Sequence, residues 1–543
     1  MRESAAGRTG FAGVVATTTA IRAARPALVW GVLFGLLIAN EALTYHSTFP
    51  TAASRQEFAA SFGGNAGLSA VIGPGRQLDT IEGVVAWRMF GLMLIVGAVW
   101  GLLTATKLLR GEEDSGRWEL LLSGRTSRRH ATVQALVGLG VGWLVLWVVT
   151  ASITVVVGSR ATVGLSVSQS VVYALAGCAS AAVFLAVGAL ASQLAGTRRQ
   201  ANGMAAAVFG VAYLIRLLAD AGLGLEGLRW ASPLGWIENV RPLTDPQPWA
   251  FLPVAVLVVG LTLATIGTAG RRDVGVAAWS RRRSTAPGLD AVTRPASLWS
   301  LAWYLERWVV LAWIVGLGLL ALVFGITAGV AADAGFGSNV DETVGRLGGS
   351  GSVMEAWVGY EFLYLAAILA FGAATQIASL RDEEAEGHLD NLLVRPVTRS
   401  RWLLGRLTVA ATLVVGSGAA VAVGGWAGVS GHGIGLVPML EAGLSTAVPG
   451  LVVLGLGALI YGTLPRLAAP TLYVLVLWSF LVETFGTSLT DNQRILDTSL
   501  LTHLGPVPAA DLNTPAVLTF LGSALALTAL GLLGFRRRDL SAA

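Results

Sequence analysis

Residues 110–129 read RGEEDSGRWELLLSGRTSRR, a polar segment after a long apolar run, and the chain repeats this plan at residues 381–401, RDEEAEGHLDNLLVRPVTRSR. Aligned without gaps, both copies carry an arginine, two glutamates, a glycine, two leucines and a second arginine. The matching residues are Arg110 and Arg381, Glu112 and Glu383, Glu113 and Glu384, Gly116 and Gly387, Leu121 and Leu392, Leu122 and Leu393, and Arg128 and Arg399. Self-similarity of this kind indicates an internal duplication. The working part of the protein is therefore predicted to occur twice.

The repeated segment has the periodicity of a short amphipathic helix. Trp118 and the two leucines of the first copy fall at i, i+3 and i+4, and Leu389 takes the place of Trp118 in the second. A glycine inside a helix costs about 1 kcal/mol relative to alanine, so the two matched glycines predict a bend or a close approach of the backbone to a partner. An apolar triplet beside acidic residues suits a groove in a soluble partner, where each buried leucine contributes about 1.5 to 3 kcal/mol. An interfacial helix that only caps two membrane spans is the alternative.

The composition is that of a membrane protein. Apolar residues make up 54% of the 543, charged residues 13%, and soluble domains carry about 25% charged residues. The single Cys178 excludes an intramolecular disulfide framework, and the five histidines are scattered without the spacing of a metal site. The only lysine, Lys107, follows Thr106, so the chain has no G-x-x-x-x-G-K-[ST] phosphate loop. We predict that the chain binds no cofactor and is not an enzyme.

Twelve apolar runs are long enough to cross a bilayer core of about 30 Å, which predicts an all-α protein of two six-span repeats. The first half is predicted at 1–270, a cytoplasmic connector at 271–300 and the second half at 301–543. The runs lie near 26–45, 84–108, 131–157, 169–194, 203–220, 249–270, 304–330, 356–380, 403–429, 438–463, 467–486 and 514–535.

The basic residues indicate the orientation of these spans. Most of the 37 lie on one side of the twelve-span arrangement, including those of both repeated segments and of both ends of the chain. By the positive-inside rule, the termini and the repeated segments are predicted to be cytoplasmic in a multi-pass protein of the plasma membrane. Because the halves have equal, even span counts, they are predicted to be parallel repeats about an axis along the membrane normal.

Charged residues inside predicted spans are candidates for a translocation pathway, because each costs at least about 2.5 to 3.5 kcal/mol at mid-bilayer. Arg88 and Glu361 take near-equivalent places in the second and eighth spans, and we hypothesise that they face each other across the two halves. Arg216 and Asp220 lie at i, i+4 in the fifth span, and Glu483 lies in its counterpart, the eleventh. The alternative is that these side chains lie near the interface and extend toward water.

The second copy of the segment resembles the signature of permease subunits of type-2 ATP-binding-cassette exporters. The residues that carry the resemblance are Glu383, Glu384, Gly387, Leu392, Leu393, Pro396 and Arg399, between the second and third spans of a six-span unit. The first copy departs from it with Arg125 in place of the proline. Over most of its length the chain resembles the fused permeases of actinobacterial polyketide-antibiotic exporters, the tetronasin type.

This resemblance implies partners and a substrate. It implies that the repeated segments are coupling helices that dock separate ATPase subunits, either two copies or a heterodimer, which hold ATP and Mg. It also implies a loop that re-enters the outer leaflet before the last span of each half, at 221–248 and 487–513, and export of bulky apolar drugs. The net charge of +5 is not interpreted as nucleic-acid binding.

Two other functions are compatible with parts of the pattern. A proton-coupled secondary drug transporter also has twelve spans, and Glu361 or Glu483 would be its titrating carboxylate. The acidic helix between the second and third spans argues against it. A polytopic lipid-linked glycosyltransferase would need an acidic motif in the first outer loop, where Asp79 and Glu82 are the only nearby pair. The internal duplication argues against that function.

Overall fold

The computed structural model of the chain divides into two compact units, Met1–Leu289 and Asp290–Ala543. It describes residues 13–64, 69–70, 72–118, 127–269, 297–334, 353–385, 387, 389, 392, 394, 398–489 and 492–539. Most of the predicted connector lies outside the described residues, so its boundaries stay a prediction. Each unit is described by itself.

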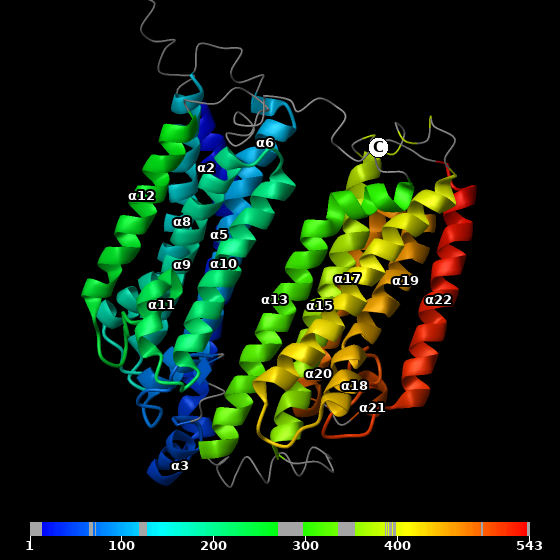
Figure 1. Cartoon of the computed structure of the whole chain (residues 1–543). Helices are drawn as coiled ribbons and strands as arrows, with labels where there is room; N and C mark the ends of the chain where they lie inside the picture. The colour runs from blue at the N-terminus through cyan, green and yellow to red at the C-terminus, as the bar shows by residue number, and fades with distance from the viewer. Residues whose placement is uncertain are drawn as a thin grey trace, which may run out of the picture. The chain divides into compact units, whose positions relative to one another are not determined.

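The first unit is built from long helices that run side by side, with the short α6 at one end and α3 and α11 at the other (Figure 1). Within it, α2 packs on α8, α5 packs on α9, and α9 also packs on α12. We call the two ends of this unit the α6 end and the α11 end. Its elements are α2 (Val14–Thr48), α3 (Ala52–Phe62), α5 (Ile81–Leu108), α6 (Arg110–Asp114), α8 (Arg128–Gly158), α9 (Val167–Leu194), α10 (Arg198–Asp220), η1 (Glu226–Ala231), α11 (Pro233–Glu238), η2 (Pro248–Ala250) and α12 (Phe251–Ala269).

The second unit repeats this packing plan. Its first long helix packs on its third, its second on its fourth, and its fourth on its last, as α13 on α17, α15 on α19 and α19 on α22. The duplication read from one polar segment therefore extends to the packing of whole helices. The elements are α13 (Leu298–Ala334), α15 (Val353–Ala385), α17 (Arg399–Gly428), α18 (Leu436–Ser445), α19 (Ala447–Thr463), α20 (Pro465–Leu489), α21 (Gln493–Leu496) and α22 (Thr514–Arg537).

The predicted all-α class is confirmed, since the part of the chain that the structure describes has helices and no strand. Among the described residues, twelve helices are long and apolar enough to cross a membrane, one for each predicted run. Several boundaries differ. The first helix begins at Val14 instead of near residue 26, and the second and eighth continue to Asp114 and Ala385, so that each includes the glutamate pair of its repeated segment.

Small residues allow close contact between α2 and α8. A side chain at Gly142 would place its Cβ 2.5 Å from the Cβ of Ala23, and one at Gly138 would lie 2.7 Å from the carbonyl oxygen of Ala16. Gly140, on the same helix, has nothing within 4 Å of that position. Two of the three glycines in this run are thus packing contacts, as expected for small residues at the interface of membrane helices.

We expect Gly142→Leu to destabilise the first unit, because the added side chain meets the backbone and Cβ of Ala23, and overpacking costs roughly 1 to 3 kcal/mol. Gly140→Leu is the matched control on the open face of the same helix. The thermal unfolding midpoint of each purified variant in detergent measures the effect. Equal midpoints for the two variants would show that close packing at Gly142 is not required.

Candidate functional site

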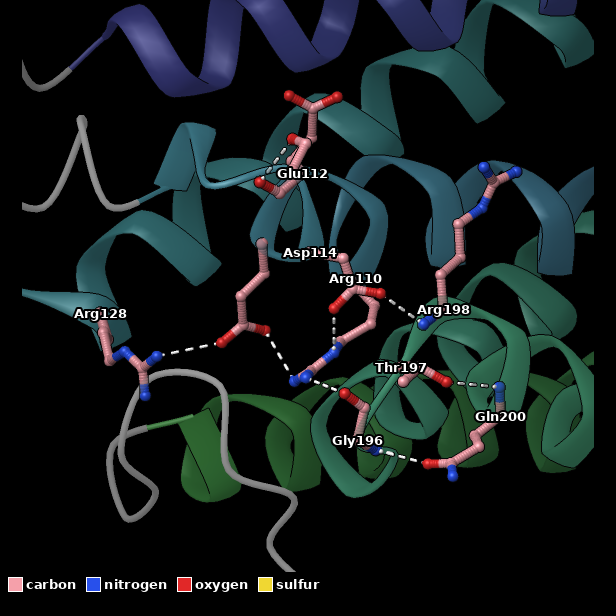
Figure 2. A network of polar contacts seen from close by, with 10 residues as sticks. Arg110, Glu112, Asp114, Arg128, Gly196, Thr197, Arg198 and Gln200 are labelled. Carbon is pink, nitrogen blue, oxygen red and sulfur yellow. Dashed lines mark hydrogen bonds and ion pairs between the residues drawn. The ribbon is translucent and has the colours of Figure 1, made fainter. Parts of the chain in front are cut away.

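The acidic pair of the first repeated segment lies at the end of the second span, and Glu113 is buried there. Its carboxylate accepts hydrogen bonds from Arg110 Nη1 at 3.1 Å and from Arg128 Nη2 at 3.0 Å (Figure 2). Arg128 is the first residue of α8. A buried carboxylate between two guanidinium groups is compensated on both sides. This contact fixes the end of the second span to the start of the third.

The same short helix is also bound to the turn between α9 and α10. Arg110 donates a hydrogen bond to the carbonyl oxygen of Gly196, and its Nε lies 2.9 Å from Asp114 Oδ1 (Figure 2). Asp114 Oδ2 accepts a hydrogen bond of 2.6 Å from the backbone nitrogen of Arg198, the first residue of α10. A carboxylate is favoured at a helix N-terminus by the free N–H groups and the helix dipole. We call Arg110, Asp114 and the residues they bind at 196–198 the α6 clamp.

Glu384, the counterpart of Glu113, is buried in the second unit, where Arg381, the counterpart of Arg110, lies 4.0 Å from it and other partners bind it more closely. Arg538 Nη2 donates to its two carboxylate oxygens at 2.9 and 2.8 Å, and Tyr461 Oη donates to Oε2 at 2.8 Å. Arg399, the counterpart of Arg128, instead donates to the carbonyl oxygen of Arg538 at 2.6 Å. The second span of this unit is therefore tied to α19 and to the residue that follows α22.

The first glutamate of each pair is less buried and contacts surface or interior arginines. Glu112 lies 2.8 Å from Arg22 and 3.4 Å from Arg117, both of which are exposed. Glu383 pairs with Arg406 of α17, which also lies 3.2 Å from Glu306 of α13. Glu306 is a charge inside a predicted span, and the rule that selected Arg88 would have found it.

The predicted coupling helix is corrected in its N-terminal part. Gly116 and Gly387 both have φ of +72°, in the left-handed region that favours glycine. Among the described residues, no atom lies within 4 Å of the place that a Cβ would take at either glycine. The predicted bend is present, and the alternative, a close approach of the backbone to a partner, stays a prediction. The glutamates therefore end the second span of each half, and the glycine separates them from the apolar residues that follow.

The residues after the glycine are only partly described. Trp118 and Leu389 are buried within their own units, so their predicted part in a docking surface changes to that of core residues. Leu392 is half-buried, and Val394 is 89% exposed. Leu121, Leu122, Leu393 and Pro396 lie outside the described residues.

Among the pathway candidates, Arg216 and Asp220 form part of a buried network at the α11 end. Their side chains lie 3.3 Å apart, as their i, i+4 spacing predicts. Arg216 Nε also donates to Glu238 Oε2 at 2.8 Å, and Arg229 Nε donates to Asp220 Oδ1 at 2.5 Å. Burial alone would raise the pKa of Glu238, but the adjacent Arg216 lowers that pKa below its ordinary value. Two cations thus balance two carboxylates.

Sequence reasoning did not select Arg229 and Glu238. Both lie in the loop before the last span of the first half, outside any apolar run, so no rule about charges in spans applies to them. Their role depends on the loop folding back against α10. Ser232 of the same loop donates a hydrogen bond of 2.7 Å to the carbonyl oxygen of Ala212, which holds the loop there.

The other pathway candidates have partners in their own units. Arg88 Nη1 lies 3.3 Å from Glu41 Oε2 of α2, so Arg88 has a carboxylate partner in its own unit, and its hypothesised pairing with Glu361 stays a prediction. Buried Glu361 accepts a hydrogen bond of 2.9 Å from Trp357 Nε1 one turn away. Glu483 accepts one of 3.1 Å from Thr502.

Comparison with known proteins gives matches in both halves. A family model described as ABC-2 family transporter protein matches residues 18–228, and one described as the C-terminal domain of multidrug efflux system permease Rv1217c matches residues 296–536. Over 530 residues, the chain is 29% identical to the multidrug efflux system permease protein Rv1217c of Mycobacterium tuberculosis. The matched region covers 94% of this chain and 92% of that protein. The chain is an ABC-2 type permease.

This permease is a multi-pass membrane protein of the exporter class, and it acts in transport and not as an enzyme. The comparison confirms the predicted type-2 family, whereas the likeness to the tetronasin type stays a prediction. The proton-coupled alternative is not favoured. The first family model ends at residue 228, in the loop after the fifth span, and the second begins at residue 296, just before the seventh span.

We expect Glu113→Gln to lower the thermal unfolding midpoint of the purified permease more than Glu112→Gln. The first change leaves Arg110 and Arg128 without their shared charge in a buried place, which costs roughly 1 to 3 kcal/mol. The second removes ion pairs to exposed arginines, each of which contributes about 0 to 1 kcal/mol. Equal shifts for the two variants would contradict a structural role of Glu113.

Proposed function

We propose that the permease exports bulky apolar compounds, driven by separate ATPase subunits that dock at the α6 end of the first unit and at the equivalent end of the second. The ATPases, as two copies or a heterodimer, would hold the ATP and Mg. Both termini and both docking ends would be cytoplasmic, in agreement with the distribution of basic residues. The relative's printed name, a multidrug efflux permease, supports the choice of substrate.

The observation that carries the proposal is the α6 clamp. A docking segment can drive transport only if its movement is passed to helices that border the substrate. Through Glu113 and the clamp, the end of the second span is bound to the start of α8 and to the start of α10. Thr106 adds a hydrogen bond of 2.5 Å to Asn202, again between α5 and α10. A displacement of α6 would therefore move several spans together.

The second unit offers an equivalent route through different contacts. Glu384 connects α15 to Tyr461 of α19 and to Arg538, and Glu383 connects it through Arg406 to α17 and α13. Asp114 of the clamp corresponds to Ala385, which has no carboxylate. We infer that the two ATPase contacts act on different sets of spans and contribute unequally to transport.

The apolar residues beyond the glycines remain the proposed contact with the ATPase. Val394 is an apolar side chain with most of its surface exposed at this turn, and half-buried Leu392 lies two residues before it. Leu121, the counterpart of Leu392, is proposed for the same role in the first half. Burial of such side chains in a groove of a soluble subunit would stabilise the complex.

We expect Leu121→Asp combined with Leu392→Asp to abolish co-purification of the ATPase, because an apolar joint opposes a buried carboxylate. The matched control is Leu121→Met with Leu392→Met, which keeps the apolar contact. Val394→Asp, at an exposed position that the fold does not need, is expected to weaken the complex by itself. The measurement is the ATPase to permease ratio after purification in detergent, together with the unfolding midpoint. A stoichiometric complex in all three variants would disprove this docking surface.

A further inference from the structure

A cleft opens at the α11 end of the first unit, between residues 72–80 and the turn that follows α11. Its polar wall is formed by Arg76, Arg216, Glu238 and Arg241, and its apolar wall by side chains of α5 that include Trp87, Phe90 and Leu94. The cleft is remote from the α6 clamp, because α6 and α11 lie at opposite ends of the unit (Figure 1).

The cleft carries more positive than negative charge. Glu238 and Asp220 are already balanced by Arg216 and Arg229 in the buried network. Arg241 lies 3.4 Å from Asp245, whose side chain is 69% exposed, and an exposed pair of this kind compensates little.

Arg76 is a cation whose charge the cleft compensates only in part, because Glu238 attracts it less than Arg241 repels it. No hydrogen bond or ion pair joins it to another residue in the described part of the chain, and burial lowers the pKa of its guanidinium, as does the nearby Arg241. The Nε of Arg241 is buried and lacks a hydrogen-bond acceptor. Two neighbouring guanidinium groups with free donors form a site that an anion would stabilise.

The backbone around the cleft is held in unusual conformations. Gln77, with φ of +50°, and Arg241, with φ of +46°, are the non-glycine residues of the described chain in the left-handed region. Gln77 Nε2 donates to the carbonyl oxygen of Thr244 at 3.2 Å, which joins the two sides of the cleft. Such conformations are unfavourable for residues other than glycine and occur at ligand clamps. The fold therefore maintains the position of Arg241 at a cost.

We propose that this cleft binds the anionic group of an amphipathic ligand, with Arg76 and Arg241 on a carboxylate or phosphate and the apolar side chains of α5 beside its hydrocarbon part. Binding at this cleft requires no ATPase, so this proposal can be tested separately from the proposed docking surface. The ligand is either a soluble amphiphile, such as an acidic exported compound, or the headgroup of an anionic lipid.

The test is a titration of the full-length permease, in neutral detergent, with cis-parinaric acid, a fluorescent long-chain carboxylate. We expect saturable binding that Arg76→Gln and Arg241→Gln each weaken about tenfold, the order for one charge-assisted hydrogen bond. Arg76→Lys keeps the charge and should retain most of the affinity. Arg160→Gln, an exposed arginine outside the cleft, is the matched control and should bind as the wild type does.

Two further titrations separate the chemistry from its source. The methyl ester of the same acid should bind the wild type no better than the acid binds Arg76→Gln. Competition by phosphatidylglycerol, with none by phosphatidylcholine, would identify a lipid headgroup as the occupant, and no competition by either would identify a soluble amphiphile. Equal affinity of the wild type and both glutamine variants for the acid, or tight binding of the ester, would overturn the proposal.

Discussion

A carboxylate that is buried at the end of a membrane span needs cations or hydrogen-bond donors around it, and this requirement shapes both halves of the permease. Leaving such a charge unpaired costs several kcal/mol, whereas pairing it binds together the elements that supply the partners. Glu113 forms ion pairs with Arg110 and Arg128. Glu384 forms an ion pair with Arg538 and accepts a hydrogen bond from Tyr461. The end of the second span thereby becomes a junction between helices.

The two junctions began as copies and now differ in their connections. In the first unit the matched arginine, Arg128, holds the glutamate directly. In the second, Arg399 contacts the carbonyl oxygen of Arg538, and Arg538 holds the glutamate. A duplicated chain can change such contacts in one half while the other half keeps its own, and this freedom offers a physical route to unequal roles of the two proposed ATPase contacts.

The sequence was sufficient for the features that depend on local composition. Apolar length predicted all twelve spans, the aligned segments predicted the duplication, and the i, i+4 spacing of Arg216 and Asp220 predicted their contact. The ends of helices were harder to predict from the sequence, because the glutamates could either continue the second span or begin a separate helix. The left-handed conformation of Gly116 decides between these two arrangements.

Partners distant in the chain could not be predicted in this way. Glu238 pairs with Arg216 because a loop folds back on α10, and Arg538 reaches Glu384 across 154 positions of the sequence. Arg88 illustrates the same limit, since its contact with Glu41 of α2 could not be predicted from the positions of the two residues in the sequence. Charge rules locate a residue that needs a counterion, but tertiary packing selects the counterion.

The central claim is that the α6 clamp passes the movement of the docking end to the fourth and fifth spans. Its most direct test is the amount of compound exported per ATP hydrolysed, measured in proteoliposomes that contain the permease with its ATPase. For Asp114→Ala with Arg110→Gln, we predict an intact complex that still hydrolyses ATP but exports at least about tenfold less compound per ATP, since the charge-assisted contacts of both side chains are lost. An export ratio equal to that of the wild type, with the complex intact, would contradict the account.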